Sequence, residues 1–205
     1  GPGGPLAGSV GSYSTARGLM GASETPPATI PDVSYRQAEI QSLKDMALEH
    51  LLGTVRQAEV GKTNQYNRLV DRWDQRNQFA NLTGMTIQEV MDLQKGMIAA
   101  GHKSTAVGAY QTIASTLAES VARLGLDPKT TKFDEATQDK IAKDLIGNRA
   151  SRATVDGVVD PAKFALGLAQ EWASLPTQSG KSYYSDGVNA ASKSVSYAGL
   201  KDTVE

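Results

Sequence analysis

The chain has 205 residues, of which 40% are hydrophobic, and a formal net charge of −1. This balance gives no support for binding to nucleic acid or to an anionic membrane surface. The absence of cysteine and the presence of only two distant histidines argue against a disulfide framework, a thiolate nucleophile and a metal site, so no cofactor is expected. No apolar run approaches the roughly 20 residues that span a bilayer, and no signal peptide is recognisable.

The beginning of the chain differs in composition from the rest. Residues 1–32 are rich in Gly, Pro, Ser, Thr and Ala and start with Gly-Pro-Gly-Gly-Pro. Such a segment predicts a flexible linker, or a remnant of cloning at its very start. Residues 33–205 have the usual size of one domain. We therefore expect a single folded domain that an arm can connect to a larger protein.

Six helices are predicted from apolar periodicity and capping signals. The first, over 34–59, has apolar residues at spacings of three and four, and His50 lies beside this stripe as a surface residue. Thr86 and Glu89 form a capping box at the start of the second. The second helix runs from 86 to 100. The remaining predicted helices cover 109–125, 134 to about 149, 160–176 and 186–201. Asp134 and the pair Asp160-Pro161 are the predicted starts of two of them. The fold class is therefore mainly α.

A polar and aromatic stretch, 62–81, lacks a helical or strand period and predicts a small lobe with short strands or irregular structure. Its Tyr66, Asn67 and Trp73 suit carbohydrate, because aromatic rings stack on sugar faces and amides pair with acetamides and hydroxyls. Trp73 could equally pack with Phe79 in a small satellite core. The sequence is compatible with both interpretations, sugar binding and packing with Phe79.

Glu59 is the candidate general acid. It lies in the last predicted turn of the first helix, between Ala58 and Val60 and just before Gly61, which is a natural helix terminator. The negative end of the helix dipole and the apolar neighbours both disfavour a carboxylate there. We therefore predict a raised pKa, as a general acid needs.

The stretch 104–113 is predicted to be a short turn that enters the third helix. Gly108 supplies backbone freedom at the bend, and Tyr110 and Gln111 present a phenol and an amide at the helix start. These groups could recognise a neutral ligand rich in hydroxyls and acetamides, such as an amino sugar.

The order of several motifs resembles the bacteriophage lambda lysozyme family of muramidases, which is related to soluble lytic transglycosylases. The motifs are the helix that ends in Glu59, the run Gly108-Ala109-Tyr110-Gln111, the run Thr137-Gln138-Asp139, and Trp172-Ala173-Ser174-Leu175-Pro176. The similarity covers about 43–195. It implies an α+β lysozyme-like fold with a cleft between a helical domain and a small lobe.

The resemblance also implies an enzyme that cleaves the β-1,4 bond between N-acetylmuramic acid and N-acetylglucosamine in peptidoglycan. Glu59 corresponds to the single catalytic acid of the family, and Gly108, Tyr110 and Gln111 correspond to its cleft motif. The family's tyrosine after the proline loop corresponds best to Tyr183, with Tyr184 as the alternative. This chain departs from the family pattern at two positions, where Val60 replaces a Ser of many relatives and Ala109 replaces an Arg.

Three functions are compatible with these residues. In a lytic transglycosylase, Glu59 suffices, because the 6-hydroxyl of the muramic acid attacks within the same sugar and gives a 1,6-anhydro product. A hydrolytic lysozyme would need a second carboxylate, for which Asp71 and Asp74 are the candidates. A wall-binding or structural module of a phage particle would bind peptidoglycan without cleaving it. Delivery by a phage virion, a holin or a secretion system is expected, so that the domain acts in the periplasm or cell wall.

Overall fold

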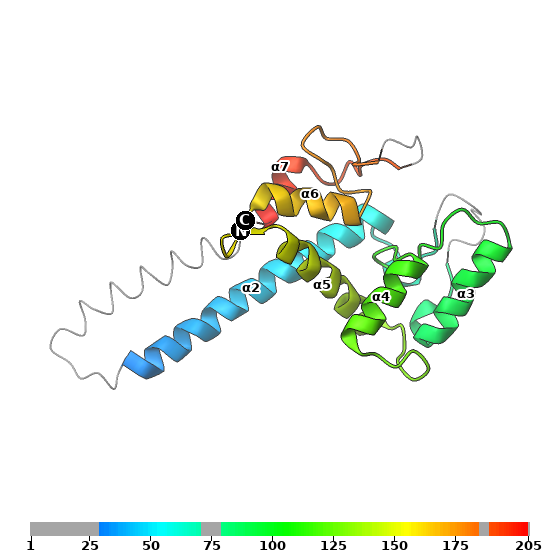
Figure 1. The fold of residues 1–205 in the computed structure, drawn as a ribbon, viewed down its shortest axis with the longest axis horizontal. Helices are drawn as coiled ribbons and strands as arrows, with labels where there is room; N and C mark the ends of the chain where they lie inside the picture. The colour runs from blue at the N-terminus through cyan, green and yellow to red at the C-terminus, as the bar shows by residue number, and fades with distance from the viewer. Residues whose placement is uncertain (1–28, 71–78, 185–188, 205) are drawn as a thin grey trace.

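The computed structural model describes residues 29–70, 79–184 and 189–204 (Figure 1). This part of the chain is mainly helical, with one two-stranded antiparallel sheet, as the fold-class prediction required. The helices are α2 (Thr29–Val60), α3 (Ile87–Ala99), α4 (Ala114–Leu124), α5 (Glu135–Arg152), α6 (Pro161–Glu171) and α7 (Tyr197–Val204). Two short 3-10 helices, η3 (Gln65–Asn67) and η4 (Leu82–Gly84), lie between α2 and α3.

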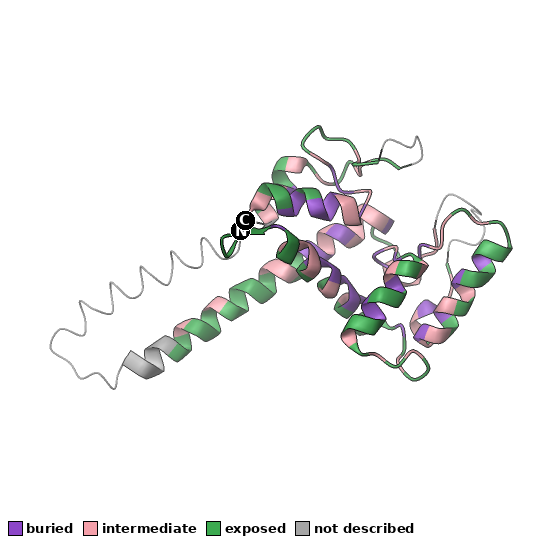
Figure 2. Cartoon of the chain, viewed as in Figure 1, coloured by how far each residue is buried: buried purple, intermediate pink, exposed green. Residues whose placement is uncertain are grey.

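Helix α2 is the longest element and projects from the rest of the molecule (Figure 1). It begins five residues earlier than predicted, because Pro31 lies in its first turn, where a missing N–H breaks no helical hydrogen bond. Its second half is packed against α5 and α7, whereas the preceding turns are mostly exposed (Figure 2). Leu43 is 46% exposed, so the predicted apolar stripe reaches the core only in the last three turns. His50 is exposed, as predicted.

The core forms where the second half of α2 meets the other helices. Leu52 and Val55 of α2 are fully buried there, together with Leu117 of α4, Ile141 of α5 and Leu168 of α6. These positions recur at helical spacing on each element, so each helix buries one face. The end of α2 is thereby held in the interior of the domain.

The caps predicted from the sequence are confirmed. The Thr86 hydroxyl accepts a hydrogen bond from the Glu89 N–H, and the Glu89 carboxylate accepts one from the Thr86 N–H, which completes the capping box of α3. Asp134 caps α5 through Thr137, and Asp160 caps α6 ahead of Pro161. Each cap satisfies backbone donors that a helix start leaves unpaired.

Two helix boundaries and the last helix were predicted wrongly. The third helix begins at Ala114, not near 109, and α6 ends at Glu171, not at Pro176. The last helix covers Tyr197–Val204, and residues 189–196 are not helical. Ser192 instead donates its N–H to the Ser174 carbonyl at 2.7 Å, a tertiary contact that competes with helix formation there.

A β-hairpin was missed altogether. Strands β1 (Thr154–Val155) and β2 (Val158–Val159) pair antiparallel around Asp156-Gly157, and both turn residues have positive φ. An Asp-Gly pair between β-branched residues is a strong hairpin signal and could have predicted it. The hairpin joins α5 to α6 and brings these two helices side by side.

The described part of the predicted polar lobe is irregular and contains isolated bridges. Arg68 pairs with Phe79. Leu69 pairs with Val107 of the stretch 104–113, which we call the motif loop. Phe79 is 43% exposed and lies under the Arg68 guanidinium. The prediction for Trp73 falls on 71–78, outside the described residues.

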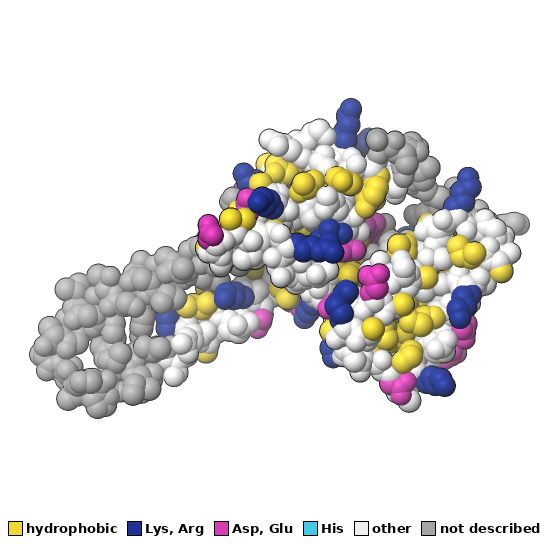
Figure 3. All heavy atoms as spheres, viewed as in Figure 1, with side chains coloured by type: hydrophobic (Ala, Val, Ile, Leu, Met, Phe, Trp, Pro, Cys, Tyr) yellow, Lys and Arg dark blue, Asp and Glu magenta, His cyan; other side chains and the backbone are white. Residues whose placement is uncertain are grey.

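Membrane-spanning helices and metal-binding clusters are both absent from the described residues. None of the helices there combines the length and apolar character that crossing a bilayer requires. The same residues hold no cluster of three or more His, Cys, Asp or Glu that could bind a metal ion. Charges of both signs are scattered over the face seen in Figure 3.

Candidate active site

Glu59 lies one residue before the end of α2, where the helix enters the domain interior. Its neighbour Val60 is buried and Ala58 packs against the core. The helix stops because Gly61 has a φ of 71°, and its N–H closes the last turn on Gln57. The backbone of Glu59 is therefore fixed from both sides.

The pKa of Glu59 is raised from its ordinary value to about 8. Burial of the carboxyl group is the main cause, and the nearby Ser174 hydroxyl partly opposes it. The residue as a whole keeps some exposed surface. At neutral pH this carboxyl group is mostly protonated, which is the state of a general acid.

The motif loop is a tight turn rather than a helix start, which corrects the prediction for 109–113. Val107 and Thr112 exchange backbone hydrogen bonds, and Gly108 and Gln111 have φ values of 81° and 45°. Two residues with positive φ cannot continue into a right-handed helix. Helix α4 therefore starts only after Ile113, where the Thr105 hydroxyl accepts from the Ala114 N–H.

The Tyr110 hydroxyl is hydrogen-bonded inside the domain. The side chain is 1% exposed, its hydroxyl donates to Asp139 at 2.6 Å, and it accepts from Arg56 at 2.8 Å. Gln111 also uses its amide inside the loop, donating to the Gly108 carbonyl. Both side chains therefore hold the loop in shape.

Asp139 is the centre of a polar cluster that joins four segments. Its Oδ1 accepts hydrogen bonds from Tyr66 at 2.9 Å and from Tyr110, and lies 3.8 Å from Arg56 Nη1. The two tyrosine rings meet edge to face, 6.5 Å apart, and the Arg56 guanidinium lies over both. Burial and the hydrogen bond to Asp139 raise the pKa of Tyr66 to about 12. This cluster connects α2 to the lobe, the motif loop and α5, one turn before Glu59.

Gln138 holds the motif loop in place through hydrogen bonds of its side-chain amide. Its Oε1 accepts from the Ala109 N–H, and its Nε2 donates to the carbonyls of Tyr66 and Phe133, each at 3.0 Å. Gln138 is 2% exposed, and its bonds to Ala109 and Phe133 are fully buried. A Cβ on Gly108 would lie 2.5 Å from the same Oε1. Only glycine therefore fits at this position of the loop.

Gly108→Ala should destabilise the fold by about 2 to 4 kcal/mol, because it combines a strained positive φ with displacement of Gln138. Gly125→Ala is the matched control, since Gly125 has a φ of 64° but nothing within 4 Å of its Cβ position. It should lose only about 1 to 2 kcal/mol. Urea unfolding measures both, and equal losses would contradict the role of the Gln138 contact.

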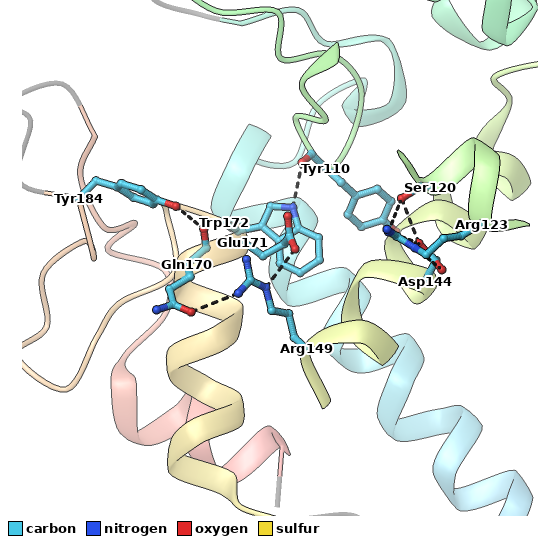
Figure 4. A network of polar contacts seen from close by, with 9 residues as sticks. All are labelled: Tyr110, Ser120, Arg123, Asp144, Arg149, Gln170, Glu171, Trp172 and Tyr184. Carbon is cyan, nitrogen blue, oxygen red and sulfur yellow. Dashed lines mark hydrogen bonds and ion pairs between the residues drawn. The ribbon is translucent and has the colours of Figure 1, made fainter. Parts of the chain in front are cut away.

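Trp172 anchors the segment that follows α6. Its indole N–H donates to the Tyr110 carbonyl at 3.0 Å, and the side chain is buried (Figure 4). In the same view Arg149 bonds Glu171 at 3.1 Å and Gln170 at 3.2 Å. These contacts place Ser174, two residues after Trp172, against the end of α2, beside Glu59.

A groove of about 440 Å³ lies between the lobe and the start of α5. Its walls include two predicted binding residues, Tyr66 and Asn67, with Thr83 from η4 and 134–136 from α5. Asn67 is used internally, accepting from the Thr83 N–H and donating to Asn64. Glu59 does not line this groove.

Tyr183 is not brought to the cluster around Asp139. It is 48% exposed in the loop after α6 and stacks edge to face on Tyr184, at 5.2 Å between ring centres. Tyr184 in turn donates its hydroxyl to the Gln170 carbonyl (Figure 4). The predictions for Trp73, Asp71 and Asp74 fall outside the described residues.

Sequence reasoning did not assign roles to Arg56, Gln138, Asp139 and Ser174. Three of these lie in the runs that carry the family resemblance, which is the signal that could have found them. Arg56 had no such signal, because an arginine on a helix is ordinarily a surface residue.

A protein-family model described as Endolysin matches residues 47–196, which is more than half of the chain. No curated protein and no solved structure matches the chain. Endolysins are phage enzymes that degrade peptidoglycan and act on the cell wall. The matched range contains Glu59, the motif loop and the segment after α6, so the chain belongs to the Endolysin family of peptidoglycan-degrading enzymes.

Proposed function

We propose that the protein is a lytic transglycosylase of the lambda lysozyme type, in which Glu59 acts first as acid and then as base. The observation that carries this proposal is the buried carboxyl group of Glu59 with a pKa of about 8. A group with this pKa keeps its proton at neutral pH and can also hold one after the first step.

The reaction needs two proton transfers and no water. Protonated Glu59 gives its proton to the glycosidic oxygen between N-acetylmuramic acid and N-acetylglucosamine, and the bond from the anomeric carbon to that oxygen breaks. The 6-hydroxyl of the same muramic acid then attacks the anomeric carbon and returns its proton to Glu59. The products are a 1,6-anhydro sugar and a free 4-hydroxyl, and the acid is regenerated.

A single acid suffices because the nucleophile belongs to the substrate. The pKa shift of Glu59 has two causes, burial and Ser174, and no carboxylate among the described residues contributes to it. Hydrolysis with retention or inversion would instead require a second carboxylate about 5 to 9.5 Å from the acid. The two candidates for that carboxylate, Asp71 and Asp74, lie outside the described residues.

Mass spectrometry of digested peptidoglycan tests the proposal. We expect muropeptides that end in 1,6-anhydro-muramic acid, which are lighter by one water than the hydrolytic products. Digestion in ¹⁸O-labelled water gives a second readout, because transglycosylation incorporates no label. Reducing ends that carry ¹⁸O would establish hydrolysis and would direct attention to Asp71 and Asp74. Binding without any cleavage would instead indicate a wall-binding module.

A further inference from the structure

The Ser174 hydroxyl is a buried polar group whose hydrogen bonding is incomplete. Within the described residues its Oγ is shielded from solvent and makes no hydrogen bond of ordinary geometry. Such a group costs free energy unless a partner appears during function. Glu59 is the titratable neighbour that the hydroxyl influences.

The backbone around Ser174 is held in place. Its carbonyl accepts from the Ser192 N–H at 2.7 Å, and Leu175 donates to the Trp172 carbonyl at 2.9 Å. Trp172 is itself fixed by its bond to Tyr110. The hydroxyl can therefore rotate about χ1, but the residue that carries it cannot move away from the end of α2.

The two chain neighbours of Glu59 on α2 cannot donate a hydrogen bond to it from their side chains. Ala58 and Val60, on either side of it, carry no hydrogen-bond donor. Charged groups on the elements packed against α2 are engaged elsewhere, Asp139 with Arg56 and Lys143 with Glu49. Arg68 donates to the Val60 carbonyl at 3.3 Å, and Arg149 of α5 and Lys201 and Asp202 of α7 belong to the elements packed against α2. None of these four residues is among the causes of the Glu59 pKa shift.

We infer that Ser174 is a positioning residue for the acid: its hydroxyl donates a hydrogen bond to the Glu59 carboxylate once the proton has left for the glycosidic oxygen. Ionised carboxylates only accept hydrogen bonds, and such charge-assisted bonds are stronger than neutral ones. Catalytic hydrogen bonds are often poorly aligned before substrate binds and tighten in the complex. The bond would therefore be stronger in the transition state than in the resting enzyme, which is the condition for raising kcat.

This inference rests on the proposed function only through its kinetic part. The Ser174 hydroxyl acts to lower the pKa of Glu59, so Ser174→Ala should raise that pKa further above its wild-type value. Because a weaker acid donates its proton less readily, kcat should fall about 10-fold, with KM nearly unchanged. The alkaline limb of the pH profile should move to higher pH, which a merely structural loss would not cause.

The test combines two measurements on the whole chain. A ¹³C NMR titration of the Glu59 carboxyl group follows its pKa directly, and turbidity loss of purified peptidoglycan follows kcat and KM across pH. Ser174→Thr retains the hydroxyl and should restore both properties towards wild type. Ser192→Ala is the matched control, because only its backbone N–H contacts Ser174 and its own hydroxyl bonds Ser194. If Ser174→Ala does not fold, Ser174→Cys replaces it with a weak donor of similar size.

The outcomes separate the two proposals. An unchanged or lowered Glu59 pKa in Ser174→Ala would overturn the role of Ser174, whatever the enzyme does to peptidoglycan. A raised pKa together with an unshifted pH profile would also overturn it, since the acid would then not be the group that Ser174 tunes. If the wild-type protein cleaves no peptidoglycan, the proposed function fails, while the titration still decides whether Ser174 acts on Glu59.

Discussion

Replacing Glu59 by Gln is expected to abolish peptidoglycan cleavage and, at the same time, to stabilise the folded protein at neutral pH. The amide keeps the shape of the side chain but has no proton to donate, so activity should fall about 100- to 10,000-fold, the usual contribution of a general acid. Glu49→Gln, an exposed residue on the same helix, should leave activity unchanged. Turbidity assays on purified walls measure both variants.

The stabilisation follows from the sign of the pKa shift. The pKa of Glu59 is about 8 in the folded protein against an ordinary value of 4.5. Its favourable contribution is therefore complete below about pH 4.5 and is lost as the pH rises through about 8. At pH 7 the unfolded chain ionises this group freely, which sets a ceiling of about 3 kcal/mol on what the neutral Gln can recover.

We expect Glu59→Gln to raise the free energy of unfolding by about 1 to 3 kcal/mol at pH 7, because the amide must also be desolvated. The gain should disappear near pH 4, where Glu59 is protonated in both states. Urea unfolding at pH 4 and pH 7 checks this dependence. If the difference in unfolding free energy between Glu59→Gln and wild type is the same at pH 4 and pH 7, the carboxyl group is not held neutral in the folded protein. Another residue would then have to be the acid.

Asp139→Ala is expected to have the largest effect on stability. It removes the shared acceptor of the Tyr66 and Tyr110 hydroxyls and leaves the Arg56 guanidinium without its carboxylate partner. Both charged side chains are mostly buried, with 20% and 26% of their surface exposed. Breaking such a pair from one side costs about 3 to 5 kcal/mol, because an uncompensated charge remains.

Urea unfolding of three further variants defines the origin of this loss. Glu49→Ala breaks an exposed ion pair with Lys143 and should cost about 0.5 kcal/mol or less. Asp139→Asn keeps an acceptor oxygen but no charge, and should fall between wild type and Asp139→Ala. Adding Arg56→Met to Asp139→Ala should recover part of the loss, because the buried charge is then absent. If the double variant is no more stable than Asp139→Ala, the ion pair does not account for the effect.

The variants at Glu59 and Asp139 test neighbouring contacts at the end of α2. Arg56 and Glu59 are one turn apart on α2, so they project from neighbouring parts of the helix surface. The Asp139 cluster attaches the Arg56 side of the helix to the lobe and α5, and the segment after Trp172 covers the Glu59 side. The fold thus uses charge to position the helix and burial to keep the acid protonated.

Local sequence signals determined the helices and their caps. A helix start at Asp134 or Asp160 needs only a side-chain acceptor two or three residues before a free N–H, and the apolar spacing then identifies the buried face. The position of Glu59 at a helix end was equally local, because Gly61 stops the helix. For this reason the mainly α class and the candidate acid could both be predicted.

The errors occurred where tertiary contacts outweigh local preference. The residues 109–113 contain good helix formers, but Gln138 and Arg68, distant in sequence, hold the loop in a turn with two positive φ values. Similarly, residues 189–196 look helical in sequence, yet Ser192 bonds the Ser174 carbonyl instead.

The sequence by itself therefore determined the helical class, the caps and the helix-end position of Glu59, because each depends on residues within one or two turns of one another. Only the tertiary structure decided that the Tyr110 hydroxyl is consumed by Asp139 and Arg56, and that Ser174 lies beside the acid. Both facts depend on burial and on hydrogen bonds between residues that are 29 to 115 positions apart in the sequence. No periodicity within one segment encodes such contacts.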